Sequence, residues 1–328
     1  MNLFWAVILL VSGLVILWKA ADLLVAGAVG LAKIFGISSL IIGLTVVAMG
    51  TSAPEVAASI AGVLQKSNGG DIAVGNVFGS NIANLILVGG LVALIRPLKV
   101  QKLTLQREIP IMIGVSFLLW PFLRNSSLSR PEAAILILVF VILIILTIYT
   151  AKRESKKAKL KEYALNPDEK KYQTKDIKKC IPFIIIGLVG LAIGARMTVV
   201  GAIYIGSEIF GISEGVIALT VIALGTSLPE LVTCVVAAVK GEHDISVGNL
   251  VGSNIFNTLL VTGTAGLVRP FDVSTRFADG VDYWIMVIVS FAFAAAAVIG
   301  RRTIGRIAGI VMLSGYVFYV FYLFKFGQ

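Results

Sequence analysis

Two six-residue stretches, GTSAPE at residues 50–55 and GTSLPE at residues 225–230, place a glutamate directly after a proline within otherwise apolar sequence. Proline has no N–H, and its ring collides with the carbonyl four residues earlier, so a helix through either stretch must break or kink. Ala53, the residue before the first proline, is pushed out of helical geometry. A carboxylate buried in such surroundings is costly unless a cation compensates it. Glu55 and Glu230 are therefore candidate ligands of a cation.

The residues around these glutamates offer further oxygen atoms. The break leaves backbone carbonyls near residues 48–51 without partners, and at membrane depth such groups are tolerated only inside protein or along a wet cavity. Two pairs four residues apart, Ser80 with Asn84 and Ser253 with Asn257, each lie on one helical face. The groups that could converge with the glutamates come from Ala48, Thr51, Ser52, Ser80 and Asn84, and from Ala223, Thr226, Ser227, Ser253 and Asn257. All are hard oxygen donors, which suit calcium or sodium and disfavour zinc, copper or iron.

Other polar residues of the same segments have plainer interpretations. Asn76 and Asn249 are more typical of hydrogen bonds between helices, and a serine such as Ser52 often bonds a carbonyl of its own helix. Asn81 and Asn254 point about 100° away from the serine–asparagine faces, which favours a structural role. The simplest alternative for the two glutamates is a buried pair with Lys or Arg, but the matched segments contain no such cation at membrane depth.

The composition indicates that membrane-spanning helices position these residues. The chain has 328 residues, 58% of them hydrophobic and 14% charged, and a mean hydropathy of +0.96. A soluble globular chain is nearer half apolar and a quarter charged. Cys180 and Cys234 provide neither a disulfide framework nor a useful metal-ligand spacing. The single histidine, His243, lies in a polar turn, which argues against histidine metal clusters and Ser-His machinery.

Ten apolar segments are long enough to cross the roughly 30 Å of bilayer hydrocarbon. They cover residues 3–33, 37–65, 72–95, 108–123, 131–150, 181–208, 213–239, 245–268, 281–299 and 305–325. Residues 151–179 carry eleven Lys or Arg and five Asp or Glu, a balance of +6 within the net charge of +10, and residues 96–108 and 301–306 are basic too. Cytoplasmic loops are enriched in Lys and Arg. We therefore expect a cytoplasmic 151–180 linker, both termini outside, and a prokaryotic plasma (inner) membrane, with no nucleic-acid partner.

The chain contains an internal repeat. Residues 34–55 are identical to residues 209–230 at 15 of 22 positions, and residues 71–97 are identical to residues 244–270 at 16 of 27, which chance does not supply. Five spans, an odd number, separate equivalent points, so the second copy must be inserted upside down relative to the first. Inverted repeats are typical of secondary transporters, whose binding site lies at the repeat interface near the bilayer midplane.

The repeat determines the organisation that we expect. It predicts an all-α membrane protein with ten transmembrane helices in two inverted five-helix repeats, residues 1–150 and residues 181–328, joined by the basic linker at residues 151–180. The long helices that begin the two repeats, residues 3–33 and 181–208, would move against a core formed by the other eight helices. Asp22 in the first half aligns with Arg196 in the second, and the sequence leaves their roles open.

With GTSAPE followed by GNVFGSNIAN, and GTSLPE followed by GNLVGSNIFN, the chain resembles the sodium/calcium exchanger family of the calcium/cation antiporters, in its prokaryotic form. The resemblance covers essentially the whole chain. It implies exchange of calcium for sodium, or for protons in some branches, by alternating access around one central site. Calcium and sodium ions and the lipid bilayer would be the partners, and no tightly bound cofactor is expected. Glu55 and Glu230 would bind calcium and sodium in turn.

The resemblance also implies roles for the residues around the glutamates. Thr51 and Thr226 would give main-chain oxygens to calcium, and Ser80 and Ser253, with the carbonyls of Ala48 and Ala223, would complete flanking sodium sites. Asn84 and Asn257 would line the centre of the site. Ser52 and Ser227 would support the broken helices. Some family members have an aspartate at the position of Asn257. The amides here leave two formal charges in the site, which weakens a case for potassium.

Three other functions are compatible with parts of the pattern. A calcium/proton antiporter would use protonation of the buried glutamates as its counter-load, because burial disfavours the charged form of a carboxylate. A membrane enzyme with Ser52 or Ser227 as nucleophile would need a base, and no G-x-S-x-G or H-E-x-x-H motif occurs. A channel would not need strong, paired ion sites. We therefore expect a secondary antiporter and not an enzyme, without a regulatory domain, for which the 151–180 linker leaves no room.

Overall fold

The structure of the protein, a computed structural model, describes residues 2–65, 69–165, 177–209, 223–278 and 280–326. Within these residues the chain is mostly helical, with π-helical segments (η) inside several helices and a few two-residue strands. The elements of the first half are α1 (Leu3–Phe35), α2 (Ser39–Ile42), η1 (Gly43–Val47), α3 (Ala48–Thr51), α4 (Ala53–Val63), α5 (Gly69–Ile82), η2 (Ala83–Val88), α6 (Gly89–Ile95), β1 (Leu98–Lys99), η3 (Thr104–Glu108), α7 (Ile109–Leu123), β2 (Ser127–Leu128) and α8 (Arg130–Leu165). Those of the second half are α9 (Ile177–Tyr204), η5 (Ile205–Ile209), α11 (Ala223–Thr226), α12 (Leu228–Lys240), α13 (His243–Phe256), η7 (Asn257–Val261), α14 (Thr262–Val268), β3 (Phe271–Asp272), α15 (Thr275–Ala278), α16 (Val281–Ile299), β4 (Thr303–Ile304) and α17 (Arg306–Phe326).

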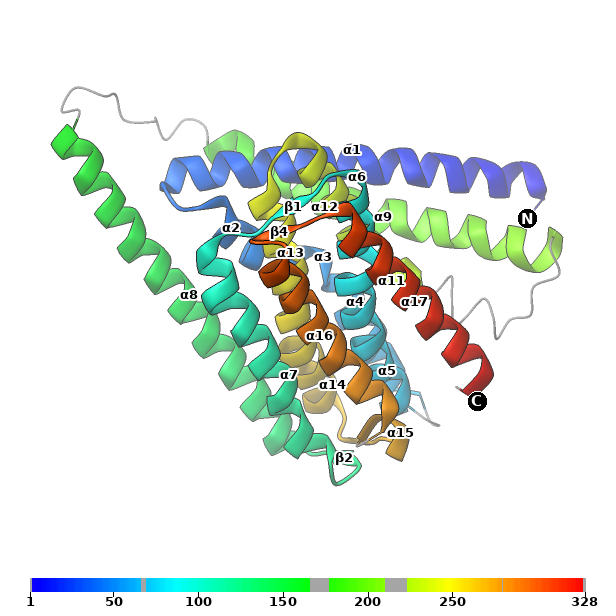
Figure 1. The fold of residues 1–328 in the computed structure, drawn as a ribbon. Coiled ribbons are helices and arrows are strands. Elements are labelled where there is room, and N and C mark those ends of the chain that lie inside the picture. The colour runs from blue at the N-terminus through cyan, green and yellow to red at the C-terminus, as the bar shows by residue number, and fades with distance from the viewer. Residues whose placement is uncertain (1, 66–68, 166–176, 210–222, 279, 327–328) are drawn as a thin grey trace.

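The two long helices α1 and α9 lie side by side across one end of the other helices (Figure 1). Their backbones approach closely because small residues line the contact. A Cβ added to Gly13 would lie 2.5 Å from the hydroxyl of Thr198, and one added to Gly187 would lie 2.9 Å from the carbonyl of Ala20. Small residues allow this approach in membrane helices, where van der Waals contact rather than water exclusion drives association.

Two antiparallel strand pairs connect the halves at opposite ends of the bundle (Figure 1). In the first pair, Leu98 of β1 lies opposite Ile304 of β4. In the second, Leu128 of β2 lies opposite Phe271 of β3. The helices next to these strands also pack across the two halves: α17 of the second half packs against α6 of the first, and α8 of the first half packs against α14 of the second. The two halves are therefore interlocked, and each covers part of the other.

Seven helices in the described part of the chain are long and apolar enough to cross a membrane, or eight if the bent pair from Ser39 to Val63 counts as one span. The protein is thus an all-α membrane protein. The expected span 108–123 is not among them; it corresponds to α7 and the last residue of η3, which runs directly into α7. The expected span 213–239 begins within residues 210–222, which lie outside the described residues. The count of ten stays a prediction.

Helix α8 continues beyond residue 150, where the sequence predicts the start of the linker, and ends at Leu165. The hydropathy of a segment indicates where the membrane ends, but not where the helix ends. Residues 151–165, AKRESKKAKLKEYAL, are rich in strong helix formers, so the helix propagates into water. The next eleven linker positions, 166–176, lie outside the described residues, and α9 begins at Ile177.

Candidate cation site

Helices α4 and α12 each begin directly after the break that a proline motif predicts. The residues at the breaks are Ser52 (φ −82°, ψ 4°) and Ser227 (φ −87°, ψ 2°). The first break bends the chain by about 40°. The sequence predicted that Ala53 is the non-helical residue, and this is wrong by one position, because Ala53 is already the first residue of α4. The proline fits here because the N–H that it lacks has no acceptor in the first turn of a helix.

Each glutamate lies in the first turn of the helix that follows its break, and each is fully buried, with 0% of Glu55 and of Glu230 exposed. The partial positive charge at a helix N-terminus favours a carboxylate there. The two carboxylates are close enough to interact electrostatically with each other. In the described part of the chain, the ion pairs join Arg107 to Glu108 and Lys240 to Asp22, and neither involves the two glutamates. No protein cation compensates this pair of charges there.

Hydrogen bonds between the halves assemble the surroundings of Glu230. The hydroxyl of Ser52 donates to Oε1 of Glu230 over 3.2 Å, and that of Ser253 approaches the same oxygen to 3.5 Å. The hydroxyl of Thr51 donates to Oδ1 of Asn249 over 3.1 Å. Ser52 therefore donates to the buried carboxylate of Glu230, a residue 178 positions later in the sequence.

The site contains many buried polar atoms without a hydrogen-bond partner among the described residues. They are both carboxylate oxygens of Glu55, Oε2 of Glu230, the hydroxyls of Ser80 and Ser227, and the side-chain amides of Asn84 and Asn257. Ser80 interacts with the Glu55 carboxylate, but outside strict hydrogen-bond geometry. An unsatisfied buried polar group costs about 1–3 kcal/mol, and a charged group costs more. Desolvated sodium or calcium ions would satisfy such a set of oxygens.

Both amides that were expected to line the centre lie in π-helical segments. Asn84 belongs to η2, and Asn257 is the first residue of η7. The hydroxyl of Thr262 donates to the carbonyl of Asn257, five residues earlier, over 3.2 Å. Both amides are fully buried. Single π-helical turns within α-helices occur frequently at functional sites because they re-aim side chains and loosen the backbone pairing. No pattern in the sequence indicates these π-helical segments.

The sequence predicted that the break leaves the carbonyl of Ala48 without a hydrogen-bond partner, and this prediction is wrong. This carbonyl accepts hydrogen bonds from the N–H of Ser52 over 3.0 Å and from the hydroxyl of Thr51 over 3.3 Å. The helical pairing survives to Ser52 because the proline first removes a donor further along the chain. Ala223 and Thr226 lie in α11, whose preceding residues, 210–222, lie outside the described residues.

Asn76 and Asn249 connect the glutamate helices to their neighbours, which confirms the prediction that they bond between helices. The side-chain N–H groups of Asn76 donate to the main-chain carbonyl of Glu55 over 3.1 Å and to the hydroxyl of Ser59 over 2.9 Å. In the second half, the amide of Asn249 donates to the sulfur of Cys234 over 3.3 Å. Ser59 and Cys234 each lie four residues after a glutamate, a shared spacing that could have identified both.

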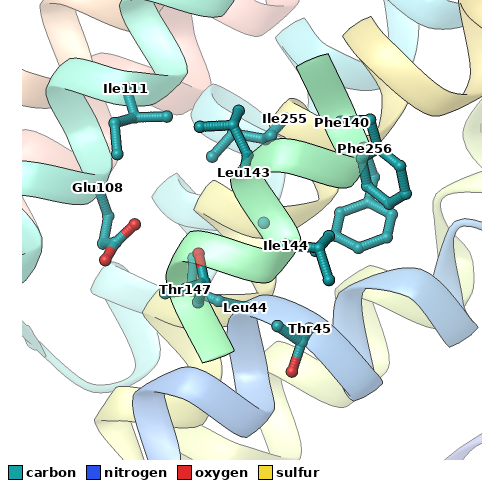
Figure 2. Close-up of a pocket in the computed structure, with 11 residues that line it drawn as sticks. Leu44, Thr45, Glu108, Ile111, Phe140, Leu143, Ile144, Thr147, Ile255 and Phe256 are labelled. Atoms are coloured by element: carbon teal, nitrogen blue, oxygen red, sulfur yellow. The ribbon is translucent and has the colours of Figure 1, made fainter. Parts of the chain in front are cut away.

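Two further acidic residues that could hold ions are occupied by protein cations. Figure 2 shows Glu108 at a small cavity of about 30 Å³, lined mainly by apolar side chains of η1, α7, α8 and α13, and this cavity contains none of the predicted ion ligands. The Glu108 carboxylate accepts from Arg107 over 2.7 Å. Asp22, whose role the sequence left open, pairs with Lys240 of α12 over 2.5 Å, not with Arg196.

Similarity to known proteins extends over the whole chain. The family profile described as sodium/calcium exchanger protein matches residues 5–149 and 180–325. The inner membrane protein YrbG of Escherichia coli (strain K12) is 36% identical over 97% of this chain and 97% of its own length. The sodium/calcium exchanger MaX1 of Methanosarcina acetivorans is 33% identical over 97% of this chain and 98% of its own.

A solved structure has the same fold. That of the sodium-calcium exchanger NCX_Mj matches with a TM-score of 0.82 at 28% identity, over 98% of this chain and 100% of that one. Both halves of the chain, including the two buried glutamates and their surroundings, fall within the family match. The chain belongs to the sodium/calcium exchanger family.

Proposed function

We propose that this protein exchanges calcium for sodium across the membrane by alternating access. One observation carries the proposal: Glu55 and Glu230, from different halves, are fully buried and interact with each other, and no ion pair of the described residues neutralises them. Two unpaired carboxylates at membrane depth need a cation. They balance either one divalent ion or two monovalent ions, which is the charge relation that an exchanger of calcium and sodium requires.

The proposed ion ligands surround these carboxylates with oxygen atoms of serine, threonine, asparagine and the main chain. We assign calcium and sodium in turn to Glu55 and Glu230, supported by Thr51, Thr226, Ser80, Ser253, Asn84, Asn257, Ser52 and Ser227 and the carbonyls of Ala48 and Ala223. The hydrogen bonds of Ser52 and Ser253 to Glu230, and the unsatisfied oxygens of Glu55, Ser80 and Asn84, support this assignment. The Ala48 carbonyl would use its second lone pair.

Competition for the same carboxylates would couple the two ions. A bound calcium ion and a full load of sodium cannot both satisfy Glu55 and Glu230, so each ion is released before the other binds. The inverted repeat suits this cycle, since two mirror-related states follow from exchanging the roles of the halves. We propose ten spans in two such halves, 1–150 and 181–328, with both termini outside and the 151–180 linker in the cytoplasm of a prokaryotic cell.

Protonation of the carboxylates is the alternative counter-load, since one of two interacting buried acids readily takes a proton. The names of MaX1 and NCX_Mj favour sodium. The test is calcium uptake by vesicles that contain the purified protein, with sodium, potassium and proton gradients imposed separately. We expect a sodium gradient to drive uptake at clamped pH, and potassium to have no effect. Uptake driven by a pH gradient alone, with sodium inert, would replace sodium by protons; uptake without any counter-ion would indicate a channel.

A further inference from the structure

The first strand pair lies beside an open pocket of about 320 Å³ that is lined by cations. Its charged lining residues are Lys99, Arg301, Arg302 and Asp244. Asp244 accepts a hydrogen bond from the amide of Gln101 over 2.5 Å. None of the ion pairs in the described part of the chain involves the three cations. The three cations therefore outnumber the one acidic residue of the pocket, Asp244, and among the described residues none of them forms an ion pair with it.

The two arginines occupy a turn that is unfavourable for such residues. They follow the end of α16, and their φ angles are 50° for Arg301 and 69° for Arg302. Positive φ is uncommon for residues other than glycine, asparagine and aspartate. The backbone of the turn is held firmly, because the N–H of Arg302 donates to the carbonyl of Ala297 over 2.7 Å and its carbonyl accepts from the N–H of Val100 over 2.8 Å. This places the pair of side chains at the strand pair.

A related turn in the first half of the chain contains no arginine at these positions and has one residue with positive φ instead of two. After α7, Asn125 and Ser126 lead into β2, Ser126 has a φ of 59°, and its carbonyl accepts from the N–H of Val273 over 2.9 Å. A pocket lies beside that turn as well, but its charged lining residues are Asp71, Asp272 and Arg269. A turn that leads from a helix into such a strand pair therefore forms without arginine, and of these two pockets only the one at Arg301 and Arg302 is basic.

We propose that Lys99, Arg301 and Arg302 bind the phosphate headgroup of an anionic phospholipid. Arginine and lysine are suited to phosphate, and basic pockets at the ends of membrane helices bind anionic headgroups. The surroundings favour a lipid over a soluble phosphate. Ile299 precedes the turn and is 82% exposed, and Ile307 follows it and is 81% exposed. Exposed apolar side chains on both sides of a basic turn match the acyl chains and the headgroup of one lipid molecule.

An excess of positive charge in cytoplasmic loops also orients membrane proteins, and this would account for the charge alone. A role of the charge in orienting the protein does not require that the cations line one pocket or occupy a turn with positive φ angles. The two explanations differ in one respect: a topology signal depends on the number of charges near the membrane, whereas a lipid site depends on these three side chains. Substitutions that remove equal charge at different places therefore separate them.

The experiment titrates the purified full-length protein, in neutral detergent, with phosphatidylglycerol or phosphatidylcholine and counts bound lipids by native mass spectrometry. The test variant combines Arg301→Asn with Arg302→Ser, which installs the residues of the related turn. The control combines Lys178→Gln with Lys179→Gln, two exposed cations at the start of α9. We expect the test variant to bind phosphatidylglycerol about 30-fold more weakly, which corresponds to about 1 kcal/mol for each cation. The control should bind as tightly as the wild type.

Several results would overturn the proposal. They are full phosphatidylglycerol binding by the test variant, an equal loss in the control, equal binding of phosphatidylcholine by the wild type, or displacement of the lipid by glycerol 3-phosphate at the same concentration, which would indicate a soluble anion. The single variant Lys99→Gln serves if the double variant does not fold, because Lys99 lies outside the turn. Its binding should weaken about fivefold, and unchanged binding would also refute the lipid site.

Discussion

Replacing Glu230 by glutamine tests the central claim, because the amide has nearly the same shape but no charge. A unit charge pair separated by about 4 Å at an effective dielectric constant of about 20 interacts by about 4 kcal/mol. Loss of one carboxylate thus removes about 8 kcal/mol of attraction for calcium and about 4 kcal/mol for sodium. Since each 1.4 kcal/mol corresponds to a factor of ten, sodium affinity should fall roughly a thousandfold and calcium affinity by far more.

Stability should respond in the opposite direction. Without ions, Glu55 and Glu230 are two interacting buried carboxylates, so removing one charge relieves repulsion and desolvation cost. We expect the thermal unfolding midpoint of Glu230→Gln in ion-free buffer to be equal to or above that of the wild type. Loss of exchange in a protein of undiminished stability would identify an ion ligand rather than a structural residue.

Glu108 offers a matched control, since it is also a buried acid of a membrane helix, with 3% of its surface exposed. It differs in being paired with Arg107 over 2.6 Å. Glu108→Gln should lower stability, because a partly buried cation loses its partner, but should keep calcium uptake for each folded molecule. The assays are calcium binding by calorimetry, vesicle uptake and thermal unfolding. The reasoning is refuted if Glu230→Gln keeps calcium affinity within tenfold, or if both variants lose activity together.

Three further variants probe the rest of the site and the fold. Asn257→Asp adds a third carboxylate and should change the number of sodium ions moved for each calcium, measured as charge transferred for each ion; an unchanged ratio would place this residue outside the ion path. Gly13→Leu forces a side chain into the backbone of α9 and should cost about 1–3 kcal/mol of folding free energy, whereas Gly114→Ala, in open space, should not; equal thermal unfolding midpoints would contradict the contact. Cys234→Ser installs the residue type found at Ser59 in the equivalent place and should keep both uptake and stability, so a large loss of either would show that the two positions are not equivalent.

The sequence by itself predicted the features that depend on a few neighbouring residues. Proline removes a hydrogen-bond donor locally, so the breaks before Glu55 and Glu230 follow from the motifs to within one residue. Composition and apolar length predicted an all-α membrane protein. The repeat predicted equivalent roles for Asn76 and Asn249. Each of these inferences uses interactions within a turn or a property summed over a segment.

The tertiary structure alone decided which groups meet. The hydroxyl of Ser52 reaches Glu230 of the other half only because the interlocked packing brings the two breaks together. The π-helical segment at Asn257 depends on packing against other elements, which leaves no local pattern in the sequence. The basic pocket at Arg301 and Arg302 forms from two loops about 200 positions apart, brought together by a strand pair of two residues each. Contacts of this kind are set by the free energy of the whole fold, and for that reason no stretch of sequence contains them.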